Sequence, residues 1–402
     1  MFRWEAEHRG LLHDGVCMRR GIAGCHEYSV AGGEVCQAFV PTPLPPRPSL
    51  ILDIDLEHCL DLANLALGRL DGMSALMPDP SVLLYSYIRK EAVLSSRIEG
   101  TQSSLADLML YEAEGAPGLP LDDAREVSCY VSALEHGIGR VRRGMPICTR
   151  LMNEMHARLM THGRGLGKAP GEIRRTQNWI GARSARDATF VPPPAHRVAQ
   201  CLSDLERFIN DQPERYPALR KVALTHLQFE TIHPYRDGNG RLGRLLIPLM
   251  FVADGVLREP LLFLSLYFKA NRRDYYELLQ RVREHGDWEE WLWFFASGVQ
   301  VAATQAVNLA VSITQRYTVD RARIRREARR NEDALRVHHA LCRRPVARRA
   351  DITALSEQDA ASIDRGVSAL MDLGLVRRLC GTAGEPIFVY TAYLDLLNHE
   401  ET

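Results

Sequence analysis

Apolar residues recur at intervals of three and four positions along most of this chain, which is the spacing of one face of an α-helix. Segment 55–73 shows the pattern clearly, with apolar residues at Leu56, Leu60, Ala63, Leu67 and Leu70. The same spacing predicts helices over segments 81–100, 103–114, 122–141, 149–160, 197–211, 218–234, 242–256, 272–286 and 287–317. Strand-like alternation is rare, so the sequence predicts a mainly α fold.

Proline and glycine divide this helical pattern into regions. Segment 39–49, FVPTPLPPRPS, is dense in proline and is expected to run extended. Segment 162–194 is rich in glycine, and within it WIGA and TFVPPP predict a small hairpin. The expected organisation is an N-terminal segment without an assigned role (1–37), an N-terminal helical region (38–115), a core (116–300), a basic helical linker (301–330) and a C-terminal domain (331–402).

The C-terminal domain has its own pattern. Segments 332–344, 350–358 and 360–376 read as three short helices, and segment 376–390 reads as a hairpin around a glycine-rich turn. Three helices followed by a hairpin predict a winged helix-turn-helix. Residues 331–402 carry eight arginines, no lysine and eleven acidic residues, a net charge of about −3. Such a surface favours a protein contact over DNA, because DNA binding needs an excess of basic residues.

Composition narrows the class of protein. The chain has 402 residues, a formal net charge of zero and 25% charged residues, which is ordinary for a globular protein. Its nine cysteines form no CxxC pair, and its start does not read as a secretory signal. No apolar run reaches the roughly 18 residues that a membrane span needs. We therefore expect reduced thiols, a cytoplasmic location and no membrane partner.

The stretch HPYRDGNGRLGR, residues 233–244, has no counterpart in a packed core. Gly238 and Gly240 let the backbone approach a ligand closely and expose consecutive N–H groups, as in an anion-binding nest. A helix is predicted to follow, so these groups would lie at its N-terminus, where the helix dipole favours phosphate. Arg241 and Arg244 are three residues apart and share one helix face, from which both can bind phosphate oxygens.

Two further side chains of this stretch suggest chemistry. Asp237 offers a hard oxygen ligand suited to Mg²⁺ bridging the same phosphates. His233 precedes a proline that ends the helix before it, and it can accept a proton near pH 7. A plain turn would explain the glycines alone, and a calcium loop would require further ligands that do not follow. The combination favours phosphoryl or nucleotidyl transfer.

The twelve residues resemble the signature of the Fic family, His-Pro-Phe-x-Asp/Glu-Gly-Asn-Gly-Arg-x-x-Arg, with Tyr235 in place of the usual Phe. Further stretches that look like bacterial Fic proteins are FVPTPLPPRP, LGRLDGM, KEAVLSSRIEGT, GEIRRTQNWIG, ATFVPPP and NRRDYY, so the resemblance covers about residues 38–300. It implies a Fic-type helical core that transfers AMP from ATP to a Ser, Thr or Tyr hydroxyl of a target protein and releases pyrophosphate.

The resemblance also implies roles for individual residues. His233 would be the base and Asp237 would bind Mg²⁺. The residues implied to bind ATP and its phosphates are Gly238, Asn239, Gly240, Arg241, Gly243 and Arg244, with Arg244 on the γ-phosphate. Asn271 matches a position near the adenosine, and Tyr275 is a weaker candidate that could equally be a packing aromatic.

An inhibitory element is implied by SSRIEG, residues 95–100. Ser95 and Glu99 are four residues apart on one helix face, and Glu99 is expected at a helix C-terminus, where the dipole disfavours a carboxylate. The hexapeptide resembles the Fic inhibitory motif, Ser/Thr-x-x-x-Glu-Gly/Asn, in which the Glu pairs with the arginine that corresponds to Arg244. Some related enzymes also remove AMP, so de-AMPylation is a further possibility. From the hexapeptide alone, a solvated Glu99 is the alternative.

Target capture is expected at the flap, residues 171–194. A strand edge there, at Thr189, Phe190 and Val191, could pair with an extended peptide through main-chain hydrogen bonds. The alternative is an ordinary surface hairpin.

Two functions remain open from the sequence. The first is a self-inhibited protein adenylyltransferase whose partners are ATP and a target protein, including other copies of this chain; the resemblance also implies a homodimer. The second is a winged-helix DNA-binding regulator whose Fic core senses nucleotide. The intact His233 and Asp237 favour the enzyme, because a sensor needs no base. A different nucleotidyl or phosphate donor is a third possibility.

Overall fold

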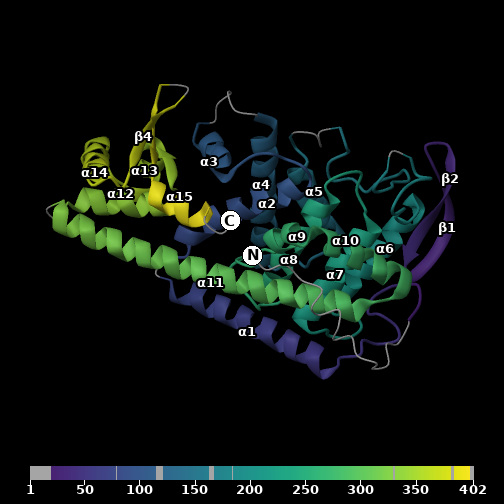
Figure 1. Ribbon diagram of the computed structural model, residues 1–402. Helices are drawn as coiled ribbons and strands as arrows, with labels where there is room; N and C mark the ends of the chain where they lie inside the picture. The colour runs from purple at the N-terminus through teal and green to yellow at the C-terminus, as the bar shows by residue number, and fades with distance from the viewer. Residues whose placement is uncertain are drawn as a thin grey trace. The chain divides into compact units, whose positions relative to one another are not determined.

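The computed structural model describes residues 20–77, 79–114, 121–162, 167–182, 184–328, 331–381 and 384–398, and the chain is mainly helical (Figure 1). The predicted mainly α fold is confirmed. Helices α1–α8 span Ile54–Leu76, Ser81–Ile98, Leu105–Glu114, Leu121–Arg142, Thr149–Leu159, Ala195–Ile209, Ala218–Ile232 and Asn239–Ala253. Helices α9–α15 span Ser265–Ala270, Arg272–His285, Trp288–Glu327, Glu332–Arg343, Arg349–Ser356, Ala360–Asp372 and Thr391–Asn398. Helices α9 and α15 were not predicted; α9 has six residues, fewer than two turns, which is too short to show a periodic pattern.

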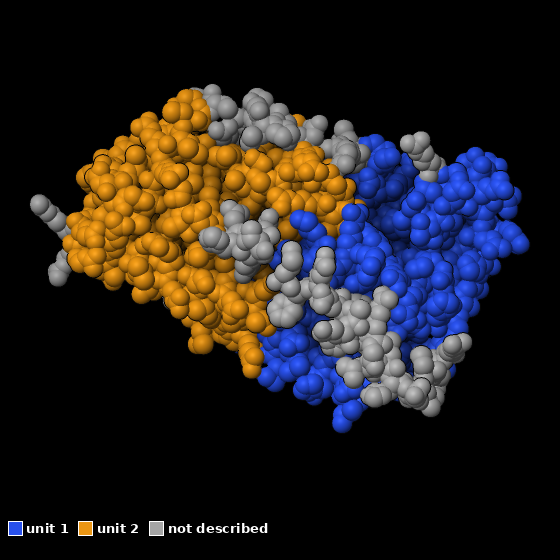
Figure 2. Space-filling view, viewed as in Figure 1, with its two compact units in different colours: residues 1–68, 132–303 blue, residues 69–131, 304–402 orange. Residues whose placement is uncertain are grey.

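The chain forms two compact units, each built from two separate stretches (Figure 2). Unit 1 contains residues 1–68 and 132–303, and unit 2 contains residues 69–131 and 304–402. The segment with the inhibitory motif therefore shares a compact unit with the C-terminal domain, and the segment 233–244 lies in the other unit.

The core of unit 1 is built around α7 and α8. Helix α8 is apolar nearly all round, as its sequence indicated, and Leu242, Leu245, Leu249 and Phe251 are buried. The two helices approach closely where Gly243 of α8 faces α7: a Cβ at this position would lie 2.4 Å from Glu230 Oε1 and 3.2 Å from the ring of Phe229. Glycine is therefore required at position 243 by packing.

A β-hairpin that the sequence analysis did not assign lies within unit 1. Strands β1 (Gly24–Ala31) and β2 (Glu34–Pro41) pair antiparallel around Gly32 and Gly33, which both have positive φ. A Gly-Gly pair between two short runs that contain valine is a hairpin signal that could have been recognised in SVAGGEVCQAFV. The extended course expected for 39–49 holds in part, because β2 ends at Pro41 and no regular element follows before α1.

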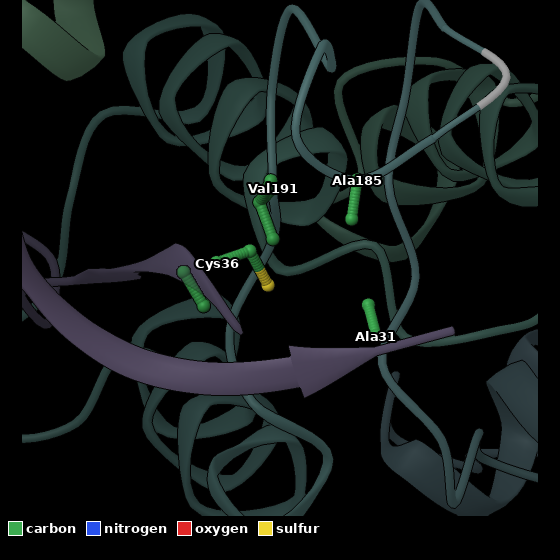
Figure 3. Packing of buried hydrophobic residues seen from close by; sticks show 5 residues of the cluster. Ala31, Cys36, Ala185 and Val191 are labelled. Atoms are coloured by element: carbon green, nitrogen blue, oxygen red, sulfur yellow. The ribbon is translucent and has the colours of Figure 1, made fainter. Parts of the chain in front are cut away.

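This hairpin packs against the flap. Ala31, Cys36 and Ala38 of the hairpin form a small buried cluster with Ala185 and Val191 of the flap, and their side chains meet between the two segments (Figure 3). The N–H of Phe39 donates to the carbonyl of Val191 at 2.8 Å. The hairpin predicted within the flap is reduced in the structure to one antiparallel bridge, between Ile180 and Phe190.

Unit 2 joins α2 and α3 to the C-terminal domain. In that domain α12, α13 and α14 accompany a three-stranded antiparallel sheet of β3 (Val346–Arg348), β4 (Arg377–Cys380) and β5 (Pro386–Val389) in the order β3-β5-β4. The predicted helices and the hairpin are present, and β3 is additional. That the domain is a winged helix-turn-helix stays a prediction.

Side chains of the C-terminal domain form hydrogen bonds with the start of α2. The hydroxyl of Tyr393 donates to the carbonyl of Val82, and Arg343 Nε donates to Ser81 Oγ at 2.9 Å. Arg344 donates to the carbonyl of Glu112 in α3 at 3.2 Å. Residues separated by more than 230 positions therefore hold α2 and α3 in one body.

Helix α11 extends further than its apolar pattern predicted. The segment expected as a basic linker continues α11 as far as Glu327, and Arg323–Glu327 and Arg316–Asp320 are i,i+4 ion pairs along it. Among the described residues, α11 is the one helix that is long and apolar enough to cross a membrane. In its apolar stretch of 18 residues, 56% is buried. Burial of this extent is typical of a core helix in a globular protein.

Candidate active site

The segment 233–244 connects α7 to α8 through a sharp turn. Helix α7 ends at Ile232, and His233 takes the left-handed conformation, with φ 48° and ψ 61°. Its N–H donates to the carbonyl of Phe229 at 2.9 Å. Pro234 excludes the helical conformation at the residue before it, so the sequence itself ends the helix at this histidine.

The centre of the turn is fixed from inside. Asn239 is buried, and its Oδ1 accepts from the N–H of Tyr235 at 2.8 Å while its Nδ2 donates to the carbonyl of Tyr235 at 2.9 Å. The ring of Tyr235 is fully buried, and its hydroxyl donates to Asn153 at 2.7 Å. The aromatic anchor expected at position 235 is therefore present.

The N-terminus of α8 provides the backbone donors that the sequence predicted. Gly238 precedes the helix with φ 78°, and a Cβ at this position would lie 2.7 Å from Met160 Sδ. The first N–H bonded within the helix is that of Leu242, which donates to the carbonyl of Gly238 at 3.0 Å. The N–H groups of Asn239 and Gly240 come before it, at the positive end of the helix, so this turn can receive an anion.

Two buried arginines add positive charge next to this helix N-terminus. Arg241 and Arg244 are 4% and 3% exposed. Arg241 lies 3.6 Å from Asp237 Oδ1, and that oxygen also accepts from the N–H of Gly238 at 2.6 Å. Buried guanidinium groups next to a helix N-terminus attract a polyanion strongly, because little water screens them.

The structure refines two of the phosphate-binding assignments. The side chain of Asn239 is directed at Tyr235, so Asn239 can meet a phosphate only through its backbone N–H. Gly243 follows the first turn and faces Glu230 and Phe229, which gives it a packing role between α7 and α8; its assignment as a phosphate ligand stays a prediction.

The positions expected near the adenosine lie at the junction of α9 and α10. Asn271 is buried there, and its Nδ2 donates to the carbonyl of Tyr267 at 3.0 Å. Tyr275 is 2% exposed and stacks on Phe268 with ring centroids 4.6 Å apart, so it is a packing aromatic in this structure.

Two buried histidines bond to the main chain of this turn and of the helix that follows it. His226 lies between the carbonyl of Gly243, 3.1 Å from Nδ1, and the hydroxyl of Tyr275, 3.0 Å from Nε2. Because a carbonyl only accepts, Nδ1 carries the proton and Nε2 accepts from the tyrosine. Burial lowers the pKa of His226 to about 3, which keeps the ring neutral.

The second of these histidines, His156, bonds to the main chain of the turn itself. Its Nδ1 accepts from the N–H of Gly171 at 2.8 Å, so Nε2 carries the proton and donates to the carbonyl of Asp237 at 3.0 Å. The ring stacks on Tyr235 with centroids 3.9 Å apart. Burial lowers its pKa to about 4. His156 thereby joins the first residues of the flap to the turn, and it was missed because it lies 81 residues from Asp237 in the sequence.

A second residue missed by sequence reasoning is Arg174. This buried guanidinium donates to the carbonyl of His233 at 2.8 Å and to that of Pro193 at 2.5 Å. The stretch GEIRRTQNWIG had been recognised only as part of the flap, and no local pattern indicated that its arginine reaches the histidine.

The flap residues expected to capture a target differ in exposure. Thr189 is exposed, whereas Phe190 and Val191 are buried. The ring of Phe190 lies 3.7 Å from the guanidinium of Arg283, and the carbonyl of Val191 is bonded to Phe39. The main-chain edge at Val191 is therefore occupied by β2.

The two residues of the inhibitory motif lie at the end of α2 in unit 2. Ser95 is fully buried, and Glu99 is the exposed C-cap, with its N–H 3.0 Å from the carbonyl of Ser96. Gly100 follows with φ 98°, the left-handed conformation that commonly ends a helix.

Comparisons with known proteins agree with this site. Residues 58–139 match the model of the Fic/DOC family N-terminal domain, and residues 146–251 match that of the Fic/DOC family. A protein adenylyltransferase Fic from Culex quinquefasciatus is 28% identical over 203 residues, 50% of this chain and 37% of that protein. One from Drosophila erecta is 27% identical over 242 residues, 57% of this chain and 44% of that protein.

The chain therefore spans less than half the length of these curated relatives. Among solved structures, a Fic family protein from Desulfovibrio desulfuricans aligns with a TM-score of 0.54 and 17% identity, over 86% of this chain and 98% of that chain. This likeness concerns the fold.

Proposed function

Since this chain belongs to the Fic/DOC family, we propose that it is a protein adenylyltransferase, which transfers AMP from ATP to a Ser, Thr or Tyr hydroxyl of a target protein. The observation that carries the proposal is the turn between α7 and α8. It places His233 at the end of α7, six positions before the first residue of α8, and the N-terminus of α8 is flanked by the buried guanidinium groups of Arg241 and Arg244. An anion cradle beside a base is what nucleotidyl transfer to a hydroxyl requires.

The residues present fit a magnesium ion held together with the substrate. The carboxylate of Asp237 is 40% exposed at the mouth of the cradle. Among the described residues no three His, Cys, Asp or Glu side chains gather into a metal cage. One carboxylate, completed by phosphate oxygens and water, is the usual arrangement for Mg²⁺. When bound, the ion would neutralise charge that develops on the phosphates.

The chain's own residues have distinct parts in the reaction. The backbone N–H groups at the start of α8 and the side chain of Arg241 bind and orient the phosphates, and Arg244 binds the end of the triphosphate. The target's hydroxyl oxygen bonds to the α-phosphorus, the bond from that phosphorus to the oxygen bridging to the β-phosphorus breaks, and pyrophosphate leaves. His233 takes the hydroxyl proton, which raises the nucleophilicity of the oxygen in the transition state.

Inhibition by Glu99 is part of the proposal. A carboxylate at the C-terminus of α2 is disfavoured by the helix dipole, so a cationic partner is expected for it. The motif SSRIEG suggests that this partner is Arg244, which would otherwise hold the γ-phosphate. Glu99 belongs to unit 2 and Arg244 to unit 1, so the support for this pairing is the motif, and the Glu99 variants described below test it.

Intact-mass measurement after incubation with ATP and Mg²⁺ tests the proposed activity. The Glu99→Gly variant should gain the mass of one or more adenylyl groups on its own hydroxyls, and the double variant with His233→Ala should gain none while still binding ATP. Removal of a general base typically lowers a rate about 10²- to 10⁴-fold. Equal labelling with and without His233, or no labelling of any added protein by Glu99→Gly, would contradict the proposal.

A further inference from the structure

Arg174 is a buried cation whose bonding is unusual. It is 2% exposed, and burial lowers its pKa to about 10, so the guanidinium is still protonated at neutral pH. Within the described part of the chain, its hydrogen bonds go to main-chain carbonyl oxygens and no carboxylate pairs with it. Buried charges are normally neutralised by an opposite charge, so this placement must be offset by the carbonyl dipoles that surround it.

These carbonyls belong to two segments that the proposed reaction needs. At the end of α7, Nε donates to the carbonyl of His233 at 2.8 Å and one terminal nitrogen approaches that of Ile232 at 3.4 Å. The backbone N–H of Arg174 donates to the carbonyl of Pro234 at 2.9 Å. Three consecutive peptide groups centred on the histidine are thus bound by one residue.

The other segment is the end of the flap. The same terminal nitrogen donates to the carbonyl of Pro193 at 2.5 Å, and the second terminal nitrogen donates to that of Thr176 at 3.3 Å. The planar guanidinium is the group that can bind carbonyls in several directions at once, whereas an ammonium presents a single point charge. The cation also faces the negative end of the α7 dipole.

His233 needs such support, because it adopts a left-handed conformation that a side chain with a Cβ disfavours. We propose that Arg174 is a positioning residue: its guanidinium holds the peptide groups around His233 in this conformation and ties them to the flap at Pro193. The imidazole and the end of the flap then keep one relative geometry while a target enters. This inference rests on the proposed function of His233.

Variants of two buried cations distinguish positioning of His233 from general stabilisation of the fold. Arg174→Lys keeps the charge but loses the planar fork, and Arg174→Gln loses the charge. Lys221→Gln is the matched control, because Lys221 is a buried cation of unit 1 that donates to Asp211 and Asp254 at 3.0 Å and bonds neither to the flap nor to residues 232–234. All are made in the Glu99→Gly background and compared for folding by circular dichroism, ATP affinity by calorimetry and transfer rate.

We expect both Arg174 variants to lose about 100-fold in kcat, the effect of misplacing a catalytic group by about 1 Å, with ATP affinity unchanged. Lys221→Gln should keep the parent kcat. A charge that merely stabilises the fold predicts instead that Arg174→Lys restores activity. Retention of the parent kcat by a folded Arg174→Lys, or an equal loss in a folded Lys221→Gln, would overturn the proposal.

The NMR signal of the His233 imidazole gives a readout independent of transfer, and it is assigned by its absence in His233→Ala. It should shift in both Arg174 variants and stay in place in Lys221→Gln, while the signal of His226 stays in place in all of them. If the Glu99→Gly parent transfers no AMP, the proposed function fails, but this signal still decides the position of His233. An unmoved His233 signal in a folded Arg174 variant would refute the inference.

Discussion

The side chain of Asn239 bonds to both main-chain polar groups of Tyr235, accepting from its N–H at 2.8 Å and donating to its carbonyl at 2.9 Å. An amide carries a donor and an acceptor side by side, so it can do both at once. The bonds close a ring around Arg236, Asp237 and Gly238, so the shape of the cradle is set before any ligand enters. A preformed cradle binds an anion without the cost of ordering the loop.

Gly238→Ala should damage this turn in two ways. The position has φ 78°, which costs an alanine about 1–2 kcal/mol, and the new Cβ would lie 2.7 Å from Met160 Sδ. We expect a lower stability in urea and a weaker ATP affinity by calorimetry, because the helix N-terminus must shift to relieve the contact.

Gly255→Ala is the matched control for this prediction. Gly255 has φ 70° at the other end of α8, and a Cβ there would have no neighbour within 4 Å. It should show the backbone cost with unchanged ATP affinity. If the two variants bind ATP equally well, the close approach at Gly238 does not shape the cradle.

Glu99→Gln should raise the rate at which the protein labels itself during incubation with ATP and Mg²⁺. The neutral amide would no longer compete with the γ-phosphate for Arg244. The control is Glu112→Gln, which breaks the ion pair of Glu112 with Arg89 at 2.6 Å elsewhere in unit 2. If the labelling rises because unit 2 is loosened in general, both variants will show it. Gel autoradiography of the two variants beside the unmodified protein therefore distinguishes a specific inhibitory carboxylate from loss of stability.

Acid should destabilise the protein well before most carboxylates are protonated. Burial lowers the pKa of His226 to about 3 and that of His338 to about 4, from an ordinary value of 6.5. The unfolded chain therefore binds more protons than the folded one below pH 6.5, and stability falls as the pH falls from there toward about 4. Each fully titrating group contributes about 1.4 kcal/mol per pH unit.

Urea unfolding at several pH values between about 5 and 7 measures this slope. His226→Gln keeps a donor for the carbonyl of Gly243 but cannot titrate, so its stability should depend less steeply on pH. The comparison is made between slopes, since the variant is expected to be less stable at every pH. A slope identical to that of the unmodified protein would show that His226 does not stay neutral in the folded state.

Tyr393→Phe should loosen the start of α2. The substitution removes the hydroxyl that donates to the carbonyl of Val82, a buried bond for which a net cost of about 1 kcal/mol is typical. Hydrogen exchange followed by mass spectrometry should show faster exchange in peptides from α2 and unchanged exchange in those from α7 and α8. Tyr28→Phe, at a tyrosine that is 78% exposed, should change neither region.

Much of the fold was readable from the sequence because helices are encoded by neighbouring residues. The apolar spacing that predicted α1, α2, α7 and α8 reflects their burial, which covers one face of α1 and most of α2, α7 and α8. Helix α9 was missed because its six residues span fewer than two turns. The hairpin of β1 and β2 was missed although Gly32 and Gly33 marked its turn.

The chemistry of the site was also readable, since it is concentrated in twelve consecutive residues. A helix-ending proline, two glycines and two arginines at helical spacing are local features, and they determined the end of α7 at His233, the cradle and the two guanidinium groups beside it. The tertiary structure alone decided that Gly243 serves packing, that the side chain of Asn239 faces inward and that β2 occupies the flap at Val191.

The same holds for the residues that support the site. Arg174 and His156 lie 59 and 81 residues before the groups they bind, and the C-terminal domain reaches back more than 300 residues to α2. Local sequence fixes backbone propensity and turn chemistry, because those depend on adjacent side chains. Contacts between distant segments depend on how the buried faces pack. The contacts of Arg174 and His156 end on main-chain carbonyl groups, which every residue has, so no pattern of residue types in one sequence could reveal them.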